Sequence, residues 1–414
     1  MARTFLRVLV PVLTALSLLA AQAAFGASAD GDLDPSFGHD GRVTTSFAGG
    51  SSARAVAVQE DGMLVAAGVA GDGFGLARYE VDGQLDPLFG SSGKVATSIA
   101  SASGDEARAL ALQDDGMIVT AGSADDREMF AVVRYGTDGT PDPGFGTGGV
   151  FTADLTQGFD IVNGIGIQAD GKIVVAGSVG TTRPKFALLR LDADGAPDPT
   201  FGDDGVVITP YGIWGVARAM AIQPNGKIVL AGGNGGGWAL ARYTPQGELD
   251  PTFGDDGKAT SSLFGDAFAL ALQPDGKIVA AGAYDFYRFA AARFTRTGKP
   301  DRTFSKDGRV TTDIGYGSEQ IASAVAIQHD GRILVSGGVG PHESVETIDW
   351  RFALTRYRAN GVLDPAFGTG GRITTRFAGG ADAHGAVLTA GRLTVAGGSG
   401  PGNATSFALA RYGV

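Results

Sequence analysis

The feature that most constrains this 414-residue sequence is a single pattern that is repeated seven times after residue 32. Each copy begins with a segment such as LDPSFGHDGRVTT at 33–45, in which a phenylalanine marks the period. That residue recurs as Phe37, Phe89, Phe145, Phe201, Phe253, Phe304 and Phe367, so the mean repeat is 55 residues long. A repeat of this kind is one supersecondary unit, which becomes stable by packing on its neighbours.

Two further motifs follow in each copy. The first is a hairpin motif, AVAVQEDGMLVAAG at 55–68, in which an Asp-Gly or Asn-Gly pair is expected to supply the positive φ angles of a tight turn. Its two runs are apolar at successive positions, which is typical of strands that are buried on both faces. The second motif, FGLARY at 74–79, returns in every copy and ends at Tyr412 in the last.

Each repeat therefore predicts four short strands, of which VTTSF, AVAVQ, MLVAAG and FGLARY are the first examples. A ring of seven such sheets buries both faces of each sheet on its neighbours and leaves few exposed edges. We therefore expect an all-β fold, a seven-bladed β-propeller with four-stranded blades, rather than an open solenoid. The repeats span about 33–84, 85–140, 141–196, 197–248, 249–299, 300–362 and 363–414.

The order of the motifs also predicts how the ring closes. The chain opens with a VTTSF segment and ends with an FALARY segment. By analogy with WD-type repeats, each VTTSF strand is the outermost strand of the preceding blade. We therefore expect Val43–Phe47 to pair with Phe407–Tyr412, so that the N-terminal and C-terminal strands together close the ring.

Residues 1–29 have the pattern of a secretory signal peptide. Arg3 and Arg7 precede the apolar stretch VLVPVLTALSLLAAQAAF, and small residues follow it in AFGASA. A membrane anchor is the alternative, which Pro11 and the small-residue ending disfavour. We expect a secreted protein, either extracellular or at the cell surface or in the periplasm, whose residues 30–414 form one propeller.

The amino-acid composition restricts the binding partners and the chemistry that can be expected of the protein. A formal net charge of −11 without a basic cluster argues against nucleic acid and against an anionic membrane surface. The absence of cysteine excludes disulfides, thiolate metal sites and cysteine nucleophiles. The four histidines are scattered, and no catalytic motif is present, so we expect no catalytic residues, no metal and no cofactor. We expect a monomer that binds a carbohydrate or a protein.

The three motifs resemble those of the delta-60 repeat proteins, which are bacterial secreted or surface chains. Repeats of that family read LDxSFGxxGxV, then QxDGKIxVAG, then FxLxRYxxxG, and the resemblance covers roughly residues 33–414. The sixth copy departs from it at Arg302 and Ser305, and the seventh shortens the hairpin to LTAGRL at 388–393. The resemblance implies a propeller-like fold, and it implies no defined activity.

Residues that recur in all seven copies are expected to build blades, because one active site needs only one copy. This applies to the recurring aspartate and to the recurring arginine, which we expect to form ion pairs at the blade periphery. The aspartates are Asp34, Asp86, Asp142, Asp198, Asp250, Asp301 and Asp364. The arginines are Arg78, Arg134, Arg190, Arg242, Arg293, Arg356 and Arg411. The recurring phenylalanine is expected in the core between blades.

Function is expected where the copies differ, in the loops after VTTSF and after MLVAAG, which emerge on one face of the ring. Aromatic side chains there can stack on sugar rings or anchor a partner protein, or else cap the blades. They are Tyr211, Trp214, Phe264, Tyr284, Phe286, Tyr287 and Tyr316. The insertion at 339–351 adds His342 and Trp350 near several acids, which suggests either a metal or general-base role or an ordinary polar loop.

The sequence thus predicts a secreted, non-catalytic binding or interaction propeller. The alternative is an extracellular hydrolase or lyase with its site at the central opening of the variable-loop face. That alternative requires two or more carboxylates or histidines to converge at the opening.

Overall fold

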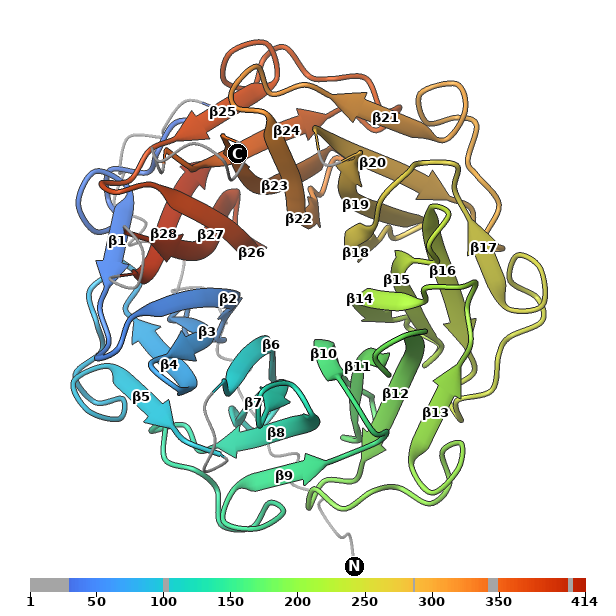
Figure 1. Cartoon of the computed structure of the whole chain (residues 1–414). Helices are drawn as coiled ribbons and strands as arrows, with labels where there is room; N and C mark the ends of the chain where they lie inside the picture. The colour runs from blue at the N-terminus through green and yellow to red at the C-terminus, as the bar shows by residue number, and fades with distance from the viewer. Residues whose placement is uncertain (1–29, 100–103, 286, 342–348, 401–404) are drawn as a thin grey trace, which may run out of the picture.

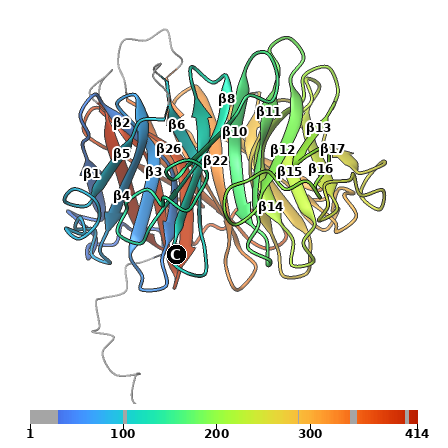
Figure 2. The same cartoon turned by 90° about the horizontal axis from the view of Figure 1, so that it is seen from below.

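The computed structural model describes residues 30–99, 104–285, 287–341, 349–400 and 405–414. Within these residues, every regular element is a β-strand, and the strands form seven four-stranded antiparallel sheets around a central axis (Figure 1). The prediction of an all-β, seven-bladed propeller is confirmed. From the side, the blades stand next to one another as a thick ring (Figure 2). The described residues include no helix of the length and hydrophobicity that a membrane span requires.

Each sheet runs outward from the axis, and blades 1 to 7 are numbered here in the order of their innermost strands (Figure 1). The innermost strands are β2 (Ser51–Val58), β6 (Glu106–Leu112), β10 (Asp160–Ile167), β14 (Val216–Ile222), β18 (Ala267–Leu272), β22 (Glu319–Ile327) and β26 (Ala381–Thr389). The second strands are β3 (Leu64–Ala70), β7 (Ile118–Ala124), β11 (Ile173–Val179), β15 (Ile228–Gly233), β19 (Ile278–Tyr284), β23 (Ile333–Gly340) and β27 (Arg392–Ser399).

The outer half of each blade follows the FGLARY and VTTSF motifs. The third strands are β4 (Gly73–Tyr79), β8 (Met129–Tyr135), β12 (Lys185–Leu191), β16 (Trp238–Tyr243), β20 (Arg288–Phe294), β24 (Arg351–Tyr357) and β28 (Ser406–Gly413). The outermost strands are β5 (Lys94–Thr97), β9 (Val150–Ala153), β13 (Val206–Thr209), β17 (Lys258–Thr260), β21 (Arg309–Thr312) and β25 (Arg372–Thr375), with β1 (Arg42–Thr45) in blade 7.

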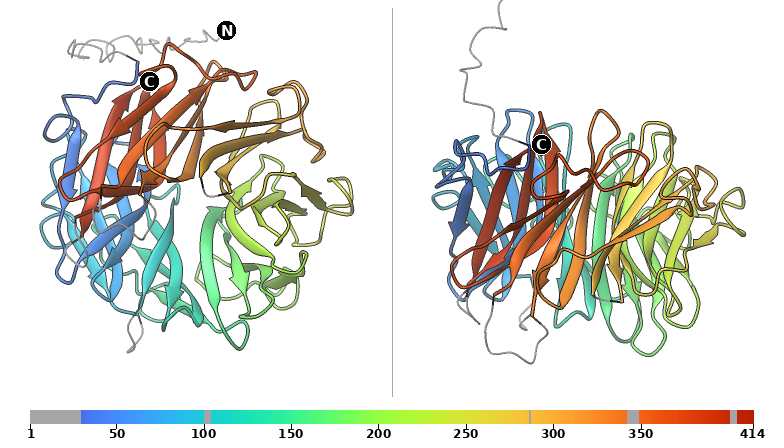
Figure 3. Two further views of the ribbon diagram at one scale, coloured as in Figure 1. Left: turned by 45° about the horizontal axis from the view of Figure 1, so that its top comes forward. Right: turned by 90° about the horizontal axis from the view of Figure 1, so that it is seen from above.

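Blade 7 contains both ends of the propeller. Strand β1 pairs antiparallel with β28, with Val43 opposite Leu409, as the order of the motifs predicted (Figure 3). The segment before β1 adds a backbone bond from Gly31 N–H to the carbonyl of Gly413, 2.8 Å long. The ring is therefore closed by hydrogen bonds between the two terminal segments.

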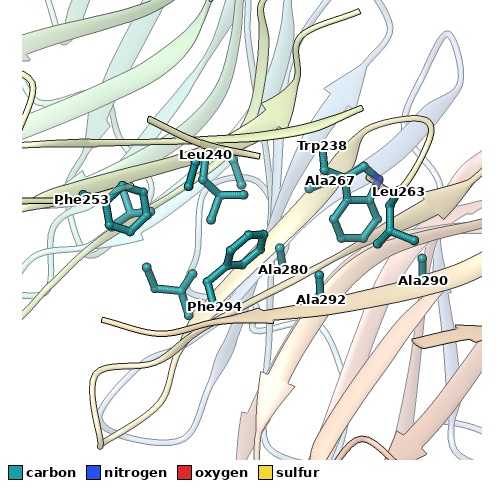
Figure 4. Close-up of a cluster of buried hydrophobic side chains, with 13 residues drawn as sticks. Trp238, Leu240, Phe253, Leu263, Ala267, Ala280, Ala290, Ala292 and Phe294 are labelled. Carbon is teal, nitrogen blue, oxygen red and sulfur yellow. The ribbon is translucent and has the colours of Figure 1, made fainter. Parts of the chain in front are cut away.

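The spaces between neighbouring blades are filled by apolar side chains. Between blades 4 and 5, Trp238 and Phe253 are fully buried against small side chains such as Ala280 and Ala292 (Figure 4). The indole N–H of Trp238 donates to the carbonyl of Ala283 at 3.2 Å, so the ring is buried without an unsatisfied donor. Alanine at these positions allows the sheets to approach closely.

The recurring arginine, aspartate and phenylalanine form one unit at the rim of each blade. In blade 4, Arg242 Nε donates to Asp250 Oδ2 at 2.7 Å, and the guanidinium lies 4.6 Å from the centre of the Phe253 ring. A further bond from Arg242 reaches the carbonyl of Arg296 in the next repeat. The predicted structural role of these residues is confirmed, since the unit fastens one blade to the next.

The hairpin turns correct one expectation. In the turn of blade 1, glycine alone takes a positive φ, 87° at Gly62, whereas Asp61 accepts a hydrogen bond from the Met63 N–H at 2.9 Å. The shortened hairpin of blade 7 has a two-residue turn, in which Ala390 and Gly391 both have positive φ. The sequence analysis predicted positive φ for both residues of an Asp-Gly pair. This prediction is correct for the glycine and wrong for the aspartate.

Candidate functional site: the mouth of the central channel

Each innermost strand has a β-bulge at the same place, which leaves one residue without a partner in the second strand. A bulge redirects the side chain of the extra residue, and here all seven side chains line a central cavity of about 540 Å³. We call these residues the bulge ring. They are Arg54, Arg108, Asn163, Arg218, Phe268, Ser323 and His384.

A glycine in the second strand makes each bulge fit. In blade 4, a Cβ atom on Gly232 would lie 1.8 Å from the carbonyl oxygen of Val216, which is too close for any side chain. The equivalent distances in the other blades are 1.9 to 2.2 Å. The glycines are Gly68, Gly122, Gly177, Gly232, Gly282, Gly337 and Gly397. The glycine that ends the hairpin motif is thus required by the close approach of two backbones.

The two variable loops of each repeat lie on the same face, as predicted. The loop before an innermost strand bonds to the loop between the second and third strands of the same blade. Examples are Gly71 N–H to the carbonyl of Gly50, 2.8 Å, and Gly180 N–H to that of Phe159, 2.8 Å. Each innermost strand begins at this variable-loop face, and the bulge follows within a few residues. The bulge ring therefore lies toward the variable-loop end of the channel.

Acidic residues stand two positions before the bulge in three blades, at Glu106, Asp266 and Asp382. Glu106 accepts hydrogen bonds from Arg54 Nε at 2.7 Å and from Arg108 Nη2 at 2.8 Å. Burial alone would raise the pKa of Glu106, but the two guanidiniums outweigh it, and the pKa lies below its usual value. One ionised carboxylate therefore joins two arginines at the channel mouth.

His384 and Asp382 continue this cluster into blade 7. His384 Nε2 lies 2.5 Å from Arg54 Nη1 and, because arginine only donates, the imidazole nitrogen accepts. Burial, together with the charges of Arg54 and Arg108, holds the pKa of His384 well below its usual value, so the ring is neutral at pH 7.

Asp382 Oδ2 lies 3.6 Å from His384 Nε2. The Asp382 side chain is 48% exposed and lines the central cavity. The surrounding protein raises the pKa of Asp382 to about 6, against an opposing effect of Arg54. A carboxyl group that titrates near pH 6 thus stands beside a neutral imidazole.

The opposite side of the mouth is less charged. Arg218 Nε donates to Asp266 Oδ2 at 3.2 Å, and its guanidinium lies 5.3 Å from the centre of the Phe268 ring. Further from the variable-loop face, the cavity is lined by apolar residues, among them Leu110, Met220, Leu270 and Val325. The described residues contain no group of three or more histidine, aspartate or glutamate side chains that are placed to hold a metal ion.

Four of the predicted aromatic residues are exposed on the variable-loop face of blades 4 and 5. Trp214 is 49% exposed, Phe264 54%, Tyr284 39% and Tyr287 49%, and Ile213 beside them is 73% exposed. Within each blade, a backbone bond joins the two variable loops: Trp214 N–H to the carbonyl of Asn234, 3.4 Å, in blade 4, and Asp285 N–H to that of Phe264, 3.2 Å, in blade 5. We call Ile213, Trp214, Phe264, Tyr284 and Tyr287 the aromatic patch.

The other predicted residues do not join this patch. Tyr211 is buried, and its hydroxyl donates to the carbonyl of Ala259 at 2.7 Å, so this ring caps a blade. Tyr316 is partly buried, donates to Asp349 Oδ2 and lies under the guanidinium of Arg351, 3.7 Å from the ring centre. Trp350 is half-buried against Gly340. Phe286 and His342 lie outside the described residues.

The bulge ring was not predicted from the sequence, although a signal for it is present. The residue between two small residues ahead of each AVAVQ-type run changes from repeat to repeat, as in ARA at 53–55, VNG at 162–164 and AHG at 383–385. A variable position inside a constant strand motif is the expected mark of a side chain that leaves the packed sheet.

Five segments of the chain match a family model that is described as "Domain of unknown function (DUF5122) beta-propeller", at residues 59–89, 113–145, 168–201, 223–253 and 273–304. Each segment begins at the glutamine of a hairpin turn and ends at the period-marking phenylalanine. These matches support a β-propeller repeat family. A search of the curated proteins finds no match.

Solved structures agree with the fold. A catalytically inactive virginiamycin B lyase from Staphylococcus aureus, crystallised with Quinupristin, is similar with a TM-score of 0.55 at 10% identity, over 89% of this chain and 98% of that one. A Lactobacillus plantarum protein gives 0.49 at 12%, over 86% and 92%. A Dyadobacter fermentans protein of unknown function gives 0.47 at 14%, over 90% and 98%. The likeness to the lyase, at 10% identity, bears on the fold alone.

Proposed function

We propose that the protein is an exported, non-catalytic binding propeller that takes a carbohydrate or a partner protein on its variable-loop face. The observation that carries this proposal is the aromatic patch, which consists of five exposed side chains on the variable loops of the neighbouring blades 4 and 5. Aromatic rings provide flat apolar faces for sugars and frequent anchors for protein partners. The pattern of residues 1–29 supports export, and the delta-60 resemblance of the repeats agrees with it.

Alanine at Trp214 and at Tyr287 is expected to weaken binding by about tenfold or more, because each change removes a large anchor from the patch. Binding is measured on a glycan array, followed by pull-down from extracellular extract for a protein ligand. Both side chains are about half exposed, so the free energy of unfolding should be unchanged. Leu88→Ala is the matched control, because Leu88 is 82% exposed in the connection between β4 and β5. Unchanged binding in both patch variants would contradict the proposal.

A second candidate is an extracellular hydrolase or lyase, and one observation favours it. The structure brings Asp382, His384 and Glu106 together at the central opening, which is the convergence that an enzyme of this kind requires. Asp382, whose pKa is about 6, is suited to exchange a proton with a substrate near that pH. Cleavage of a polysaccharide by the protein, lost in Asp382→Asn, would support this candidate. Cleavage that survives the change would exclude Asp382 as the proton donor, and the absence of cleavage in the unmodified protein would contradict the candidate.

A further inference from the structure

The charges at the channel mouth are unevenly distributed. Arg218 is balanced by Asp266, whereas Arg54 and Arg108 share the carboxylate of Glu106. Asp382, which interacts with Arg54, adds a second carboxylate that becomes ionised above about pH 6. Arginine carries five N–H donors, more than Glu106 and His384 take from Arg54. The side chains of Arg54 and Arg108 remain 31% and 22% exposed. This side of the mouth therefore offers guanidinium donors to a ligand inside the cavity, and its net charge becomes positive when Asp382 is protonated.

Guanidinium groups bind carboxylates through paired N–H donors, with a geometry that an ammonium group lacks. The same stretch of wall holds neutral groups that suit hydroxyls. His384 presents a neutral imidazole within the same ring of side chains. Asn163 adds an amide whose Oδ1 accepts from Arg108 Nη1 at 3.3 Å and whose Nδ2 donates to the carbonyl of Ala217 at 2.8 Å, which leaves one N–H and one lone pair for a ligand. Phe268 and Met220 add apolar surface on the other side, against which the C–H face of a sugar packs favourably.

The size and position of the cavity restrict the ligand further. A volume of about 540 Å³, enclosed by the innermost strands, has the size of a small-molecule site and is too narrow for a folded protein. From these observations we infer that the channel mouth binds a sugar acid, with its carboxylate between Arg54 and Arg108 and its hydroxyls on the other groups of the bulge ring. This inference rests on the proposed function, because it names the acidic carbohydrates as a ligand class of the same face.

The test compares three probes by isothermal titration calorimetry on the whole propeller: D-glucuronate, D-glucose and acetate. Glucuronate differs from glucose in its carboxylate, and from acetate in its sugar ring. We expect glucuronate to bind at least about tenfold more tightly than either control. If glucose bound as tightly as glucuronate, the proposed role of the arginines would be wrong. If acetate bound as tightly as glucuronate, the proposed role of the sugar ring would be wrong.

Variants locate the carboxylate. Arg108→Gln is expected to weaken glucuronate binding about tenfold, because it removes one of the two guanidiniums that bind the carboxylate. Glu106→Gln is expected to strengthen it, because it removes the competing carboxylate. Arg218→Gln, on the opposite side of the mouth, is the matched control and should change the affinity less than about threefold. A larger loss in Arg218→Gln than in Arg108→Gln would overturn the proposed position. If Arg108→Gln does not fold, the predicted gain in glucuronate affinity in Glu106→Gln still tests the proposed position of the carboxylate.

The pH dependence gives an independent measurement. Asp382 faces Arg54 from β2 and Glu319 from β22, and it lies beside His384 on its own strand. Protonation of Asp382 near pH 6 removes a negative charge from the cluster, while the carboxylate of a sugar acid stays ionised above about pH 5. Glucuronate should therefore bind more tightly at pH 5 than at pH 7, and Asp382→Asn should remove this difference. A pH-independent affinity in the unmodified protein would contradict the inference.

Failure of this inference can be separated from failure of the proposed function. Trp214→Ala and Tyr287→Ala lie outside the cavity and should leave the affinity for free glucuronate unchanged. If these variants lose glycan binding while glucuronate never binds, the channel inference is wrong and the patch proposal stands. If glucuronate binds as expected while the patch variants behave like the unmodified protein, the patch proposal is wrong and the channel inference stands.

Discussion

A chain that begins at Ala48, and so lacks β1 and the segment before it, is expected to lose at least about 5 kcal/mol of unfolding free energy relative to the chain 30–414. The deletion removes Phe37, which is fully buried, and leaves β28 as an open edge. It also removes Asp34, whose carboxylate pairs with the buried Arg411 at 2.9 Å, so that a charge is left uncompensated. Thermal unfolding followed by circular dichroism measures the loss, and size-exclusion chromatography detects association through the exposed edge.

A circular permutant provides the control for this deletion. In the intact protein, Gly413 N–H donates to the carbonyl of Asp32 at 3.0 Å, so a short linker can join Val414 to Asp30. The permutant begins at Ala48 and ends at Phe47, and it therefore keeps every residue from 30 onward while forming blade 7 from continuous chain. We expect it to fold. If the shortened chain were as stable as the chain 30–414, or if the permutant were as unstable as the shortened chain, the role assigned to the β1–β28 pairing would be wrong.

Gly232→Ala is the second change with a large expected effect, a loss of about 3 kcal/mol or more in unfolding free energy. The added Cβ would meet the carbonyl oxygen of Val216 at 1.8 Å, and that atom belongs to the backbone of the paired strand. This steric clash can be relieved only if β14 and β15 move apart, which breaks the hydrogen bonds beside the bulge at Arg218. Chemical denaturation with urea measures the change.

The matched control is Gly236→Ala in the following loop. At Gly236 an added Cβ would meet only Asn234 Oδ1, at 3.6 Å, which is an ordinary contact. This variant should therefore keep the stability of the unmodified protein within about 0.5 kcal/mol. Equal stability of Gly232→Ala and Gly236→Ala would show that the bulge is not held by the close approach of the two strands.

Strands and ring closure were predictable because they depend on patterns that repeat along the chain. The period marked by Phe37 and its equivalents gives the number of blades, and continuous apolar runs indicate sheets that are buried on both faces. The position of the VTTSF segment relative to the FGLARY segment was enough to pair β1 with β28. All of these signals are local, and each is present seven times.

The candidate site was less predictable because it depends on contacts between distant residues. Arg54 and His384 are separated by 330 positions and meet only when the ring is closed. The exposure of Trp214 and Tyr287 follows from their place in variable loops, whereas the burial of Tyr211 depends on two carbonyl groups of the neighbouring strands. The bulge was not predicted because one extra residue in an apolar strand leaves the pattern of hydrophobicity almost unchanged.

The closure by β1 and β28 also sets the order in which the molecule is completed. Asp34 and Arg411, which pair across the closure, are 377 positions apart. As the chain is synthesised, blades 1 to 6 emerge as continuous hairpins with local contacts, but β1 has no partner until the final residues appear. Contacts of such high sequence separation form slowly, because a long loop must close first. The last blade is therefore a late folding step, and until it forms, the nascent chain exposes an unpaired strand at its beginning.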